Sequence, residues 1–166
     1  MRKLWIFICV LCCTVLLVMI CIAARPRSRV LLTFFQPHDL YSVIPLGNMS
    51  LSKKDARYSF RINHKYVGTY SIDLHGKFDF DDSILSTAKI KTVIVSRNIV
   101  LKNVVTKLKN SGGPNYLSIV DYDVSTEVLQ RQDVDILCCI VEPDSNLEKI
   151  HGPLSFEIRR LPDFDM

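Results

Sequence analysis

The chain has 166 residues, 48% of them hydrophobic and 23% charged, which allows one ordinary domain with a short appendage and excludes a TIM barrel. Met1–Arg29 holds five basic residues and no acidic residue, so 16 of the 21 basic residues remain beside all 17 acidic residues in Val30–Met166. The net charge of +4 therefore belongs to the amino-terminal segment, and the nearly neutral remainder predicts no nucleic-acid partner.

Leu4–Ala24 is an apolar run of 21 residues in which only Thr14 lies outside the hydrophobic class. As a helix it would be about 32 Å long, which matches a hydrocarbon core of about 30 Å. We therefore expect a single-pass helix that contacts the membrane through residues 4–24. The alternative is a cleaved secretory signal with Met1–Lys3 as its basic start, although the apolar part of such signals is usually about 7 to 15 residues long.

These features divide the chain into an amino-terminal anchor or signal, residues 1–29, and a domain, residues 30–166. Basic residues flank the apolar run almost equally, with Arg2 and Lys3 before it and three arginines after it. The rule that cytoplasmic flanks are positive is therefore nearly balanced. Because a short anchor before one sizeable domain resembles a signal-anchor arrangement, we expect the carboxyl-terminal domain on the exported side, periplasmic or extracellular.

The first half of the domain contains apolar runs separated by turn-forming residues. Val30–Phe35 is short and apolar and is soon followed by a proline, which predicts a buried strand. Gln36–Asp55 contains prolines, a glycine and several polar residues, which predict a long loop. Tyr58–Ile62 and Tyr70–Leu74 alternate apolar with polar residues on either side of a short polar turn, a pattern that predicts a hairpin.

The second half of the domain contains further strand patterns. Ile90–Ser96 is rich in β-branched residues and predicts a strand. Leu101–Leu108 has apolar residues at helical spacing and predicts a short amphipathic helix, with a strand as the open alternative because several residues are β-branched. Val134–Val141 predicts a strand covered on both faces, and Leu154–Ile158 alternates as a strand with one buried face does.

Seven or eight short strands with one or two short helices follow from these patterns. Strands at this spacing favour an antiparallel sheet pair over alternating strands and helices. The sequence therefore predicts a mainly β fold, an antiparallel β-sandwich, preceded by an amino-terminal transmembrane helix.

Four pairs of aspartates stand two residues apart, a spacing that places both carboxylates on one face of a strand. Such pairs can contribute to a Ca²⁺ site, but solvated faces and turns use the same residues, and the segment after Asp79 lacks the glycine and glutamate of a calcium loop. We therefore assign no metal site. The pairs are Asp79/Asp81, Asp121/Asp123, Asp133/Asp135 and Asp163/Asp165.

The histidines and cysteines of the domain show no spacing typical of a metal or catalytic site. His38 and Asp39 are adjacent, but no nucleophile elbow occurs, so we expect no enzyme and keep a hydrolase with a serine brought near by folding as an alternative. Cys138 and Cys139 are too close for an ordinary disulfide and predict a buried pair in a strand, with a redox pair as the alternative. No catalytic, cofactor-binding or metal-binding residue is assigned, and no cofactor is expected. The other histidines are His64, His75 and His151.

Three segments carry a resemblance to a group of known proteins. They are Phe60–Ile62, Tyr66–Leu74 and Pro153–Ile158. In these segments the chain resembles small exported bacterial β-sandwich domains of uncharacterised function. The resemblance implies a sandwich in a bacterial envelope, and it transfers no catalytic residue.

An anchor before a neutral, strand-rich domain predicts a membrane-anchored, exported, non-catalytic protein that binds a protein partner or serves as an envelope accessory. Sandwiches place recognition on loops and edges, so the expected contact regions are Gln36–Asp55 and Phe78–Ser83. One alternative is an immunity-type protein that neutralises an envelope-targeted toxin, and the other is the hydrolase with a dispersed active site.

Overall fold

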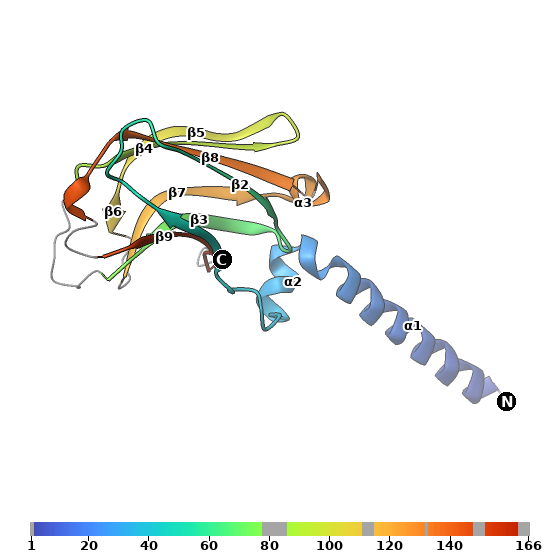
Figure 1. Ribbon diagram of the computed structural model, residues 1–166. Helices are drawn as coiled ribbons and strands as arrows, with labels where there is room; N and C mark the ends of the chain where they lie inside the picture. Colours follow the sequence, from blue (N-terminus) through green and yellow to red (C-terminus); the bar gives the residue numbers. More distant parts are fainter. Residues whose placement is uncertain (1, 78–85, 111–114, 132, 148–151, 163–166) are drawn as a thin grey trace.

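Two antiparallel sheets face each other in the computed structural model, which describes residues 2–77, 86–110, 115–131, 133–147 and 152–162 (Figure 1). The five-stranded sheet has the order β1-β9-β3-β7-β6, and the four-stranded sheet has the order β2-β8-β4-β5. The expected mainly β fold with an antiparallel sandwich is confirmed. The strands are β1 (Ile44–Met49), β2 (Arg57–Asn63), β3 (Gly68–His75), β4 (Lys89–Ser96), β5 (Ile99–Lys107), β6 (Lys109–Asn110), β7 (Tyr116–Val124), β8 (Asp133–Glu142) and β9 (Leu154–Arg160).

The hydrophobic core lies between the two sheets, and alternate residues of each strand build it. Phe156 of β9 is fully buried, and the rings of Tyr58 and Phe60 from β2 meet it edge-on at centroid distances of 5.8 and 5.3 Å. Ile72 of β3 and Ile136 of β8 are also fully buried. Aromatic and β-branched side chains that alternate along the chain therefore close the two layers.

Three of the predicted strands are confirmed: Ile90–Ser96 lies in β4, Val134–Val141 in β8 and Leu154–Ile158 in β9. The expectation that β8 is covered on both faces is wrong, because its burial alternates and Leu137 remains 47% exposed. Its outward residues Leu137, Cys139 and Val141 are apolar although they face away from the core.

Val30–Phe35, expected to be a strand, forms helix α2 (Arg29–Phe34) instead. The helix begins at Ser28, whose Oγ accepts a hydrogen bond from the N–H of Leu31 at 3.3 Å. Leu32 is the buried residue of the helix and packs in a small cluster at one end of the sandwich. A short apolar run fits a strand or a helix equally well, and here a serine cap and the burial of one side select the helix.

Gln36–Asp55 is not a continuous loop, because it contains the edge strand β1, which pairs with β9. Pro45 is compatible with an edge strand, since one side of such a strand needs no ladder hydrogen bonds. Gly47 adopts a φ of 121°, and the register shifts between Pro45 and Gly47. The turn-forming residues that predicted a loop thus form an irregular edge strand.

The hairpin predicted from Tyr58–Ile62 and Tyr70–Leu74 is wrong. β2 pairs with β8, whereas β3 lies between β7 and β9 in the other sheet. The short segment between β2 and β3 crosses from one sheet to the other. Period two therefore identified the strands but could not identify their partners, because alternation is the same in a hairpin and in a connection between sheets.

Leu101–Leu108 lies largely in strand β5 and does not form the predicted helix, so the β-branched content was the stronger signal. β4 and β5 form a hairpin. Its turn residues Arg97 and Asn98 have φ values of 41° and 70°, as a two-residue turn with two positive φ angles requires.

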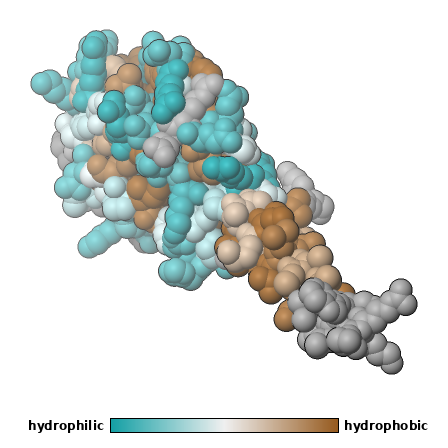
Figure 2. Space-filling model, turned by 90° about the vertical axis from the view of Figure 1, so that its right-hand side faces the viewer, coloured by the Kyte–Doolittle hydropathy of each residue, from teal (hydrophilic) through white to brown (hydrophobic). Residues whose placement is uncertain are grey.

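Two further helical segments complete the chain before and within the sandwich: α1 (Arg2–Ala24) with the 3-10 turn η1 (Arg25–Arg27), and the short α3 (Thr126–Arg131). α1 projects away from the sandwich, and its described side chains form a hydrophobic surface beside a mostly hydrophilic domain (Figures 1 and 2). Within the part of the chain whose side chains the structure describes, no helix is both long enough and apolar enough to span a membrane.

Candidate functional site

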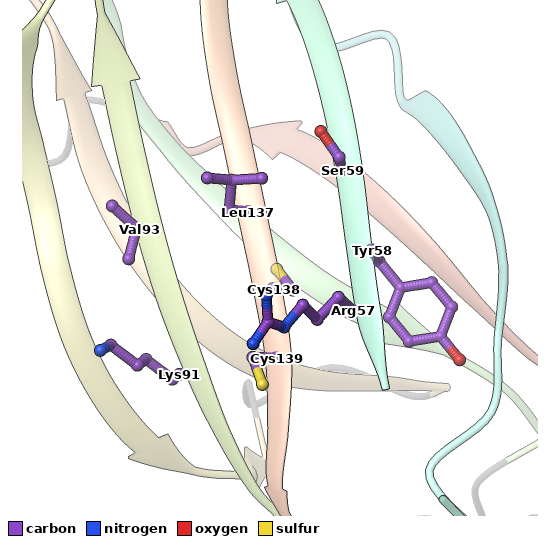
Figure 3. Close-up of a pocket in the computed structure, with 8 residues that line it drawn as sticks. All are labelled: Arg57, Tyr58, Ser59, Lys91, Val93, Leu137, Cys138 and Cys139. Carbon is purple, nitrogen blue, oxygen red and sulfur yellow. The ribbon is translucent and has the colours of Figure 1, made fainter. Parts of the chain in front are cut away.

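The outer face of the four-stranded sheet carries a shallow groove with a volume of about 320 Å³, which we call the sheet groove. Its outward-facing residues come from the strands β2, β8 and β4, and Figure 3 shows how they lie along the sheet. They are Arg57, Ser59, Lys91, Val93, Leu137 and Cys139.

Strand register brings these residues together from distant parts of the chain. Cys139 of β8 lies between Arg57 of β2 and Lys91 of β4. One step along, Leu137 lies between Ser59 and Val93 in the same way. A strip of apolar side chains therefore follows the centre of the sheet, and cations stand on both sides of it.

The apolar strip continues onto the edge strand β5. Val105 pairs with Lys91 across the sheet and is 50% exposed, and Val100 pairs with Val95 and is 58% exposed. An outward face of an antiparallel sheet normally carries polar residues, because water contacts it. The exposed valines and leucine thus make this face more apolar than a solvated sheet face usually is, which is typical of an interaction surface.

The two cations of the sheet groove differ from the other charges on the same face. Arg61 binds Asp135 and Lys89 binds Glu142, each with an N–O distance of 2.8 Å. By contrast, neither Arg57 nor Lys91 has a side-chain hydrogen bond or ion pair with any residue that the structure describes. The groove therefore offers positive charge that the chain itself leaves uncompensated.

Only one of the two adjacent cysteines is buried, so the predicted buried pair is wrong for Cys139. Cys138 points into the core, where its Sγ lies 3.9 Å from Thr92 Oγ1, and burial raises the pKa of its thiol to about 11. Cys139 points outward and lines the sheet groove. Both thiols are free, and because neighbouring strand residues face opposite sides of the sheet, the two sulfurs do not form a common redox site.

A second polar arrangement covers the outer face of the five-stranded sheet. Asp73 is fully buried although it faces outward, because Arg159 donates to it through Nε at 2.6 Å and Ser71 donates through Oγ at 2.8 Å. The Arg159 guanidinium also stacks on Tyr116 at 3.8 Å. These groups meet one another's hydrogen-bonding and charge requirements, so we interpret the arrangement as a structural network that covers this face of the sheet.

Next to it, His75 Nδ1 lies 3.4 Å from Glu157 Oε1, and Ser155 donates to the same oxygen at 3.3 Å. This brings a histidine, a carboxylate and a serine together, which no sequence motif indicated. Ser155 binds the carboxylate and not the imidazole, so the order of contacts differs from that of a nucleophile activated by histidine.

The His38–Asp39 pair considered for hydrolysis is separated by other contacts. Asp39 accepts hydrogen bonds from Lys65 at 2.5 Å and from Tyr66 at 2.7 Å, and the Lys65 ammonium lowers the pKa of this carboxyl to about 2. The side chain of His38 is exposed, and in the described part of the chain no hydrogen bond joins it to Asp39 or to a serine. The structure thus does not bring a triad together at His38.

In each of the two described aspartate pairs, one carboxylate binds a cation of the protein itself. Asp123 accepts from Arg29 at 2.8 Å and from Thr69 at 2.7 Å, and Asp135 binds Arg61. Within the described ranges, no group of three metal-ligating side chains occurs. Asp79/Asp81, Asp163/Asp165, His151 and the expected contact region Phe78–Ser83 lie outside the described residues.

One feature of the sequence corresponds to the sheet groove. β8 is apolar at successive positions from Ile136 to Val141, which predicted burial of both faces. The structure covers only the side with Ile136, Cys138 and Ile140 and leaves Leu137 exposed. A strand with one buried face needs an apolar residue only at every second position. The additional apolar residues of β8 are therefore the sequence feature that marks this surface.

No family model matches the chain, and no curated protein matches it. Among solved structures, it is similar to a protein of Sulfurospirillum deleyianum whose name states no function, with a TM-score of 0.56 and 12% sequence identity. The alignment covers 72% of this chain and 98% of that chain. At this identity the likeness supports the fold alone, so the expected resemblance to small sandwich domains holds for architecture and leaves export and function as proposals.

Proposed function

We propose that this protein is a membrane-anchored, non-catalytic binding module that holds a protein partner on its sheet groove. The observation that carries the proposal is the exposed apolar strip around Leu137 and Val93, flanked by the uncompensated cations Arg57 and Lys91. Apolar area provides most of the free energy of such contacts, and charges at the rim select the partner and speed its approach.

The charge of the groove specifies the chemistry of the partner. A segment with apolar side chains over Leu137 and carboxylates opposite Arg57 and Lys91 would complement the surface. The groove is shallow, and the neighbouring edge strand β5 lies beside it. An extended or helical protein segment fits this shape better than a small molecule, which needs a deeper cavity to bury most of its surface.

The anchor is the apolar run Leu4–Ala24, which lies within α1. At about 1.5 Å per residue its 21 residues match the thickness of the hydrocarbon core. The structure describes the side chains of α1 from Cys9 onward, which is a shorter stretch than a full span. Side chains on the described part face solvent, with Leu16 and Leu17 about two-thirds exposed at 65% and 64%. Their exposure supports a lipid environment, because water disfavours such an apolar helix.

Photo-crosslinking in cells tests the groove directly. A crosslinkable residue in place of the exposed Ser59 should trap a protein whose contact segment, identified by mass spectrometry, combines apolar and acidic residues. Leu137→Arg and Lys91→Glu should each abolish the crosslink, because the first adds a charge to the apolar strip and the second reverses a rim charge.

Asp121→Lys provides the matched control, since Asp121 is an exposed residue on the outer face of the other sheet. It should leave the crosslink unchanged, and thermal melting should be the same for all three variants. A partner that remains crosslinked after both groove substitutions, or no partner at all, would refute binding at the groove. A tight one-to-one complex with a toxin would identify the immunity-type alternative.

Protease treatment of intact cells or spheroplasts tests the anchor and its orientation. External protease should digest Val30–Met166 while a membrane-bound amino-terminal fragment remains. Complete protection of the domain would reverse the orientation, and release of the undigested domain from the membrane would indicate a cleaved signal.

A further inference from the structure

The segment that joins α1 to the sandwich is a packed element and not a loose linker. Val67 N–H donates to the carbonyl of Pro26 at 2.9 Å, and Thr126 Oγ1 donates to that of Arg27 at 3.2 Å. Arg29 binds Asp123 at 2.8 Å across to β7. η1 and α2 are thus attached to the sandwich at several points, directly after α1 ends.

α2 has one side in the protein and one side exposed. Leu32 is fully buried against Leu40, Tyr66 and Val67. Phe34, on the opposite side, is 74% exposed. Exposure of a whole phenylalanine ring on a helix that is fixed to the domain is costly in water, so this side needs another environment.

Phe35, which directly follows α2, connects this exposed side to α1. A hollow of about 350 Å³ is lined by Leu17, Val18, Cys21 and Ile22 of α1 together with Phe35. Leu17 precedes the end of α1 at Ala24 by about 10 Å at the rise of an α-helix. The Phe35 ring therefore lies beside the last two turns of α1, and α2 extends the apolar surface of α1 sideways.

We propose that α2 and Phe35 form a second membrane contact, in which Phe34 and Phe35 enter the lipid bilayer beside α1 and hold the sandwich directly on the membrane surface. This inference rests on the proposed anchoring by α1. The occupant of the surface is phospholipid, because the apolar area is continuous with the proposed span and lies within about 10 Å of its end, in the outer part of the acyl-chain region.

The charges next to α2 agree with this depth. Arg27 is exposed, and its side chain has no hydrogen bond or ion pair with the described residues. Its guanidinium is free to bind lipid phosphate at the junction between α1 and α2. Because α2 is fixed to the sandwich, this contact also sets the orientation of the sheet groove relative to the membrane.

Depth-dependent quenching of tryptophan fluorescence in vesicles tests the contact with the full-length chain. Trp5 is the only tryptophan, so Trp5→Phe combined with Phe35→Trp gives a single probe. In phosphatidylcholine vesicles this probe should emit at a shorter wavelength than a tryptophan exposed to water does. When the vesicles contain lipids brominated near the carbonyl end of the acyl chains, the probe should lose most of its emission. Trp5→Phe with Val105→Trp, on the exposed face of β5, is the matched control and should not be quenched by these lipids.

Phe34→Trp in the same background repeats the measurement at a position whose ring is mostly exposed, so a folding defect of one variant does not decide the result. The proposal is overturned if both probes respond as the Val105→Trp control does while native Trp5 is quenched by brominated lipid, because α1 is then inserted and α2 is not. If Trp5 itself escapes quenching, the anchor fails, and the second contact fails with it.

Discussion

At the scale of single residues, the buried histidine His64 is held by contacts with two tyrosines. His64 is buried between the sheets at the β2–β3 connection; its Nε2 lies 2.8 Å from the Tyr122 hydroxyl, and its ring lies 4.2 Å from that of Tyr70. Its Nδ1 has no hydrogen-bond partner among the described residues. Burial disfavours the charged imidazolium and lowers the pKa of His64 to about 4.

This shift predicts a stability that falls as the solution becomes acidic. The unfolded chain takes up a proton at its ordinary pKa of about 6.5, while the folded chain does so only near the lowered value, so the unfolded state binds more protons between these limits. The free energy of unfolding should therefore decrease by on the order of 3 kcal/mol from pH 7 to pH 4. Urea unfolding of the full chain in detergent micelles across this range measures the change.

His64→Gln should remove most of this dependence, whereas His38→Gln, which changes an exposed histidine, should retain it. Asp39 contributes little to this change, because its contribution is lost mainly between its ordinary pKa of 3.8 and its lowered pKa of about 2, below most of this range. An unchanged pH dependence in His64→Gln would assign the effect to other groups.

At the scale of elements, the crossing from β2 to β3 depends on one glycine. Gly68 begins β3 with a φ of 146°, and a Cβ built on it would lie 2.5 Å from Nε of Arg160. Arg160 is itself buried and donates to the Val67 carbonyl at 3.1 Å. The connection between the two sheets thus needs a residue with no side chain at this position.

Gly68→Ala should destabilise the sandwich by about 3 kcal/mol or more, because it combines an unfavourable φ with a collision against a buried guanidinium. Gly47→Ala is the matched comparison: its φ of 121° is also unfavourable, but no atom lies within 4 Å of the added Cβ. Its cost should be about 1 to 2 kcal/mol from backbone strain alone. Equal losses for the two variants in urea unfolding would show that the contact with Arg160 is unimportant.

At the scale of the whole molecule, α2 belongs to the sandwich although it follows the apolar helix immediately. Its Leu32 completes the cluster with Leu40, Tyr66 and Val67, which is separate from the main core. α2 therefore packs with the sandwich, whereas α1 projects away from it (Figure 1). The sheets and their end cluster form one unit that α1 leaves at Ala24.

A chain that begins at Arg25, and so keeps η1 and α2, should consequently keep the stability of the sandwich, whereas a chain that begins at Gln36 should unfold more easily. Loss of the buried Leu32 side chain alone should cost about 3 kcal/mol, as for other leucines removed from a packed interior. Thermal unfolding of the two shortened chains measures this difference, and Leu32→Ala in the full chain checks it without truncation. Identical melting of both shortened chains would mean that α2 does not stabilise the sandwich.

The sequence by itself determined the local patterns. The alternation in Leu154–Ile158 and the β-branched run in Ile90–Ser96 identified strands, because period two and side-chain branching act within a few residues. The apolar run Leu4–Ala24 stood out for the same reason. These local patterns were enough to predict a mainly β sandwich after an apolar helix, because the prediction needs no contact between distant residues.

Only the tertiary structure decided which strands pair and which faces are covered. β2 and β3 looked like a hairpin but lie in different sheets, and β8 looked buried on both sides but exposes Leu137. The sheet groove exists because register aligns Arg57, Leu137 and Lys91 from three strands that are far apart in the chain. Such alignment depends on long-range packing free energy, which one-dimensional periodicity does not contain.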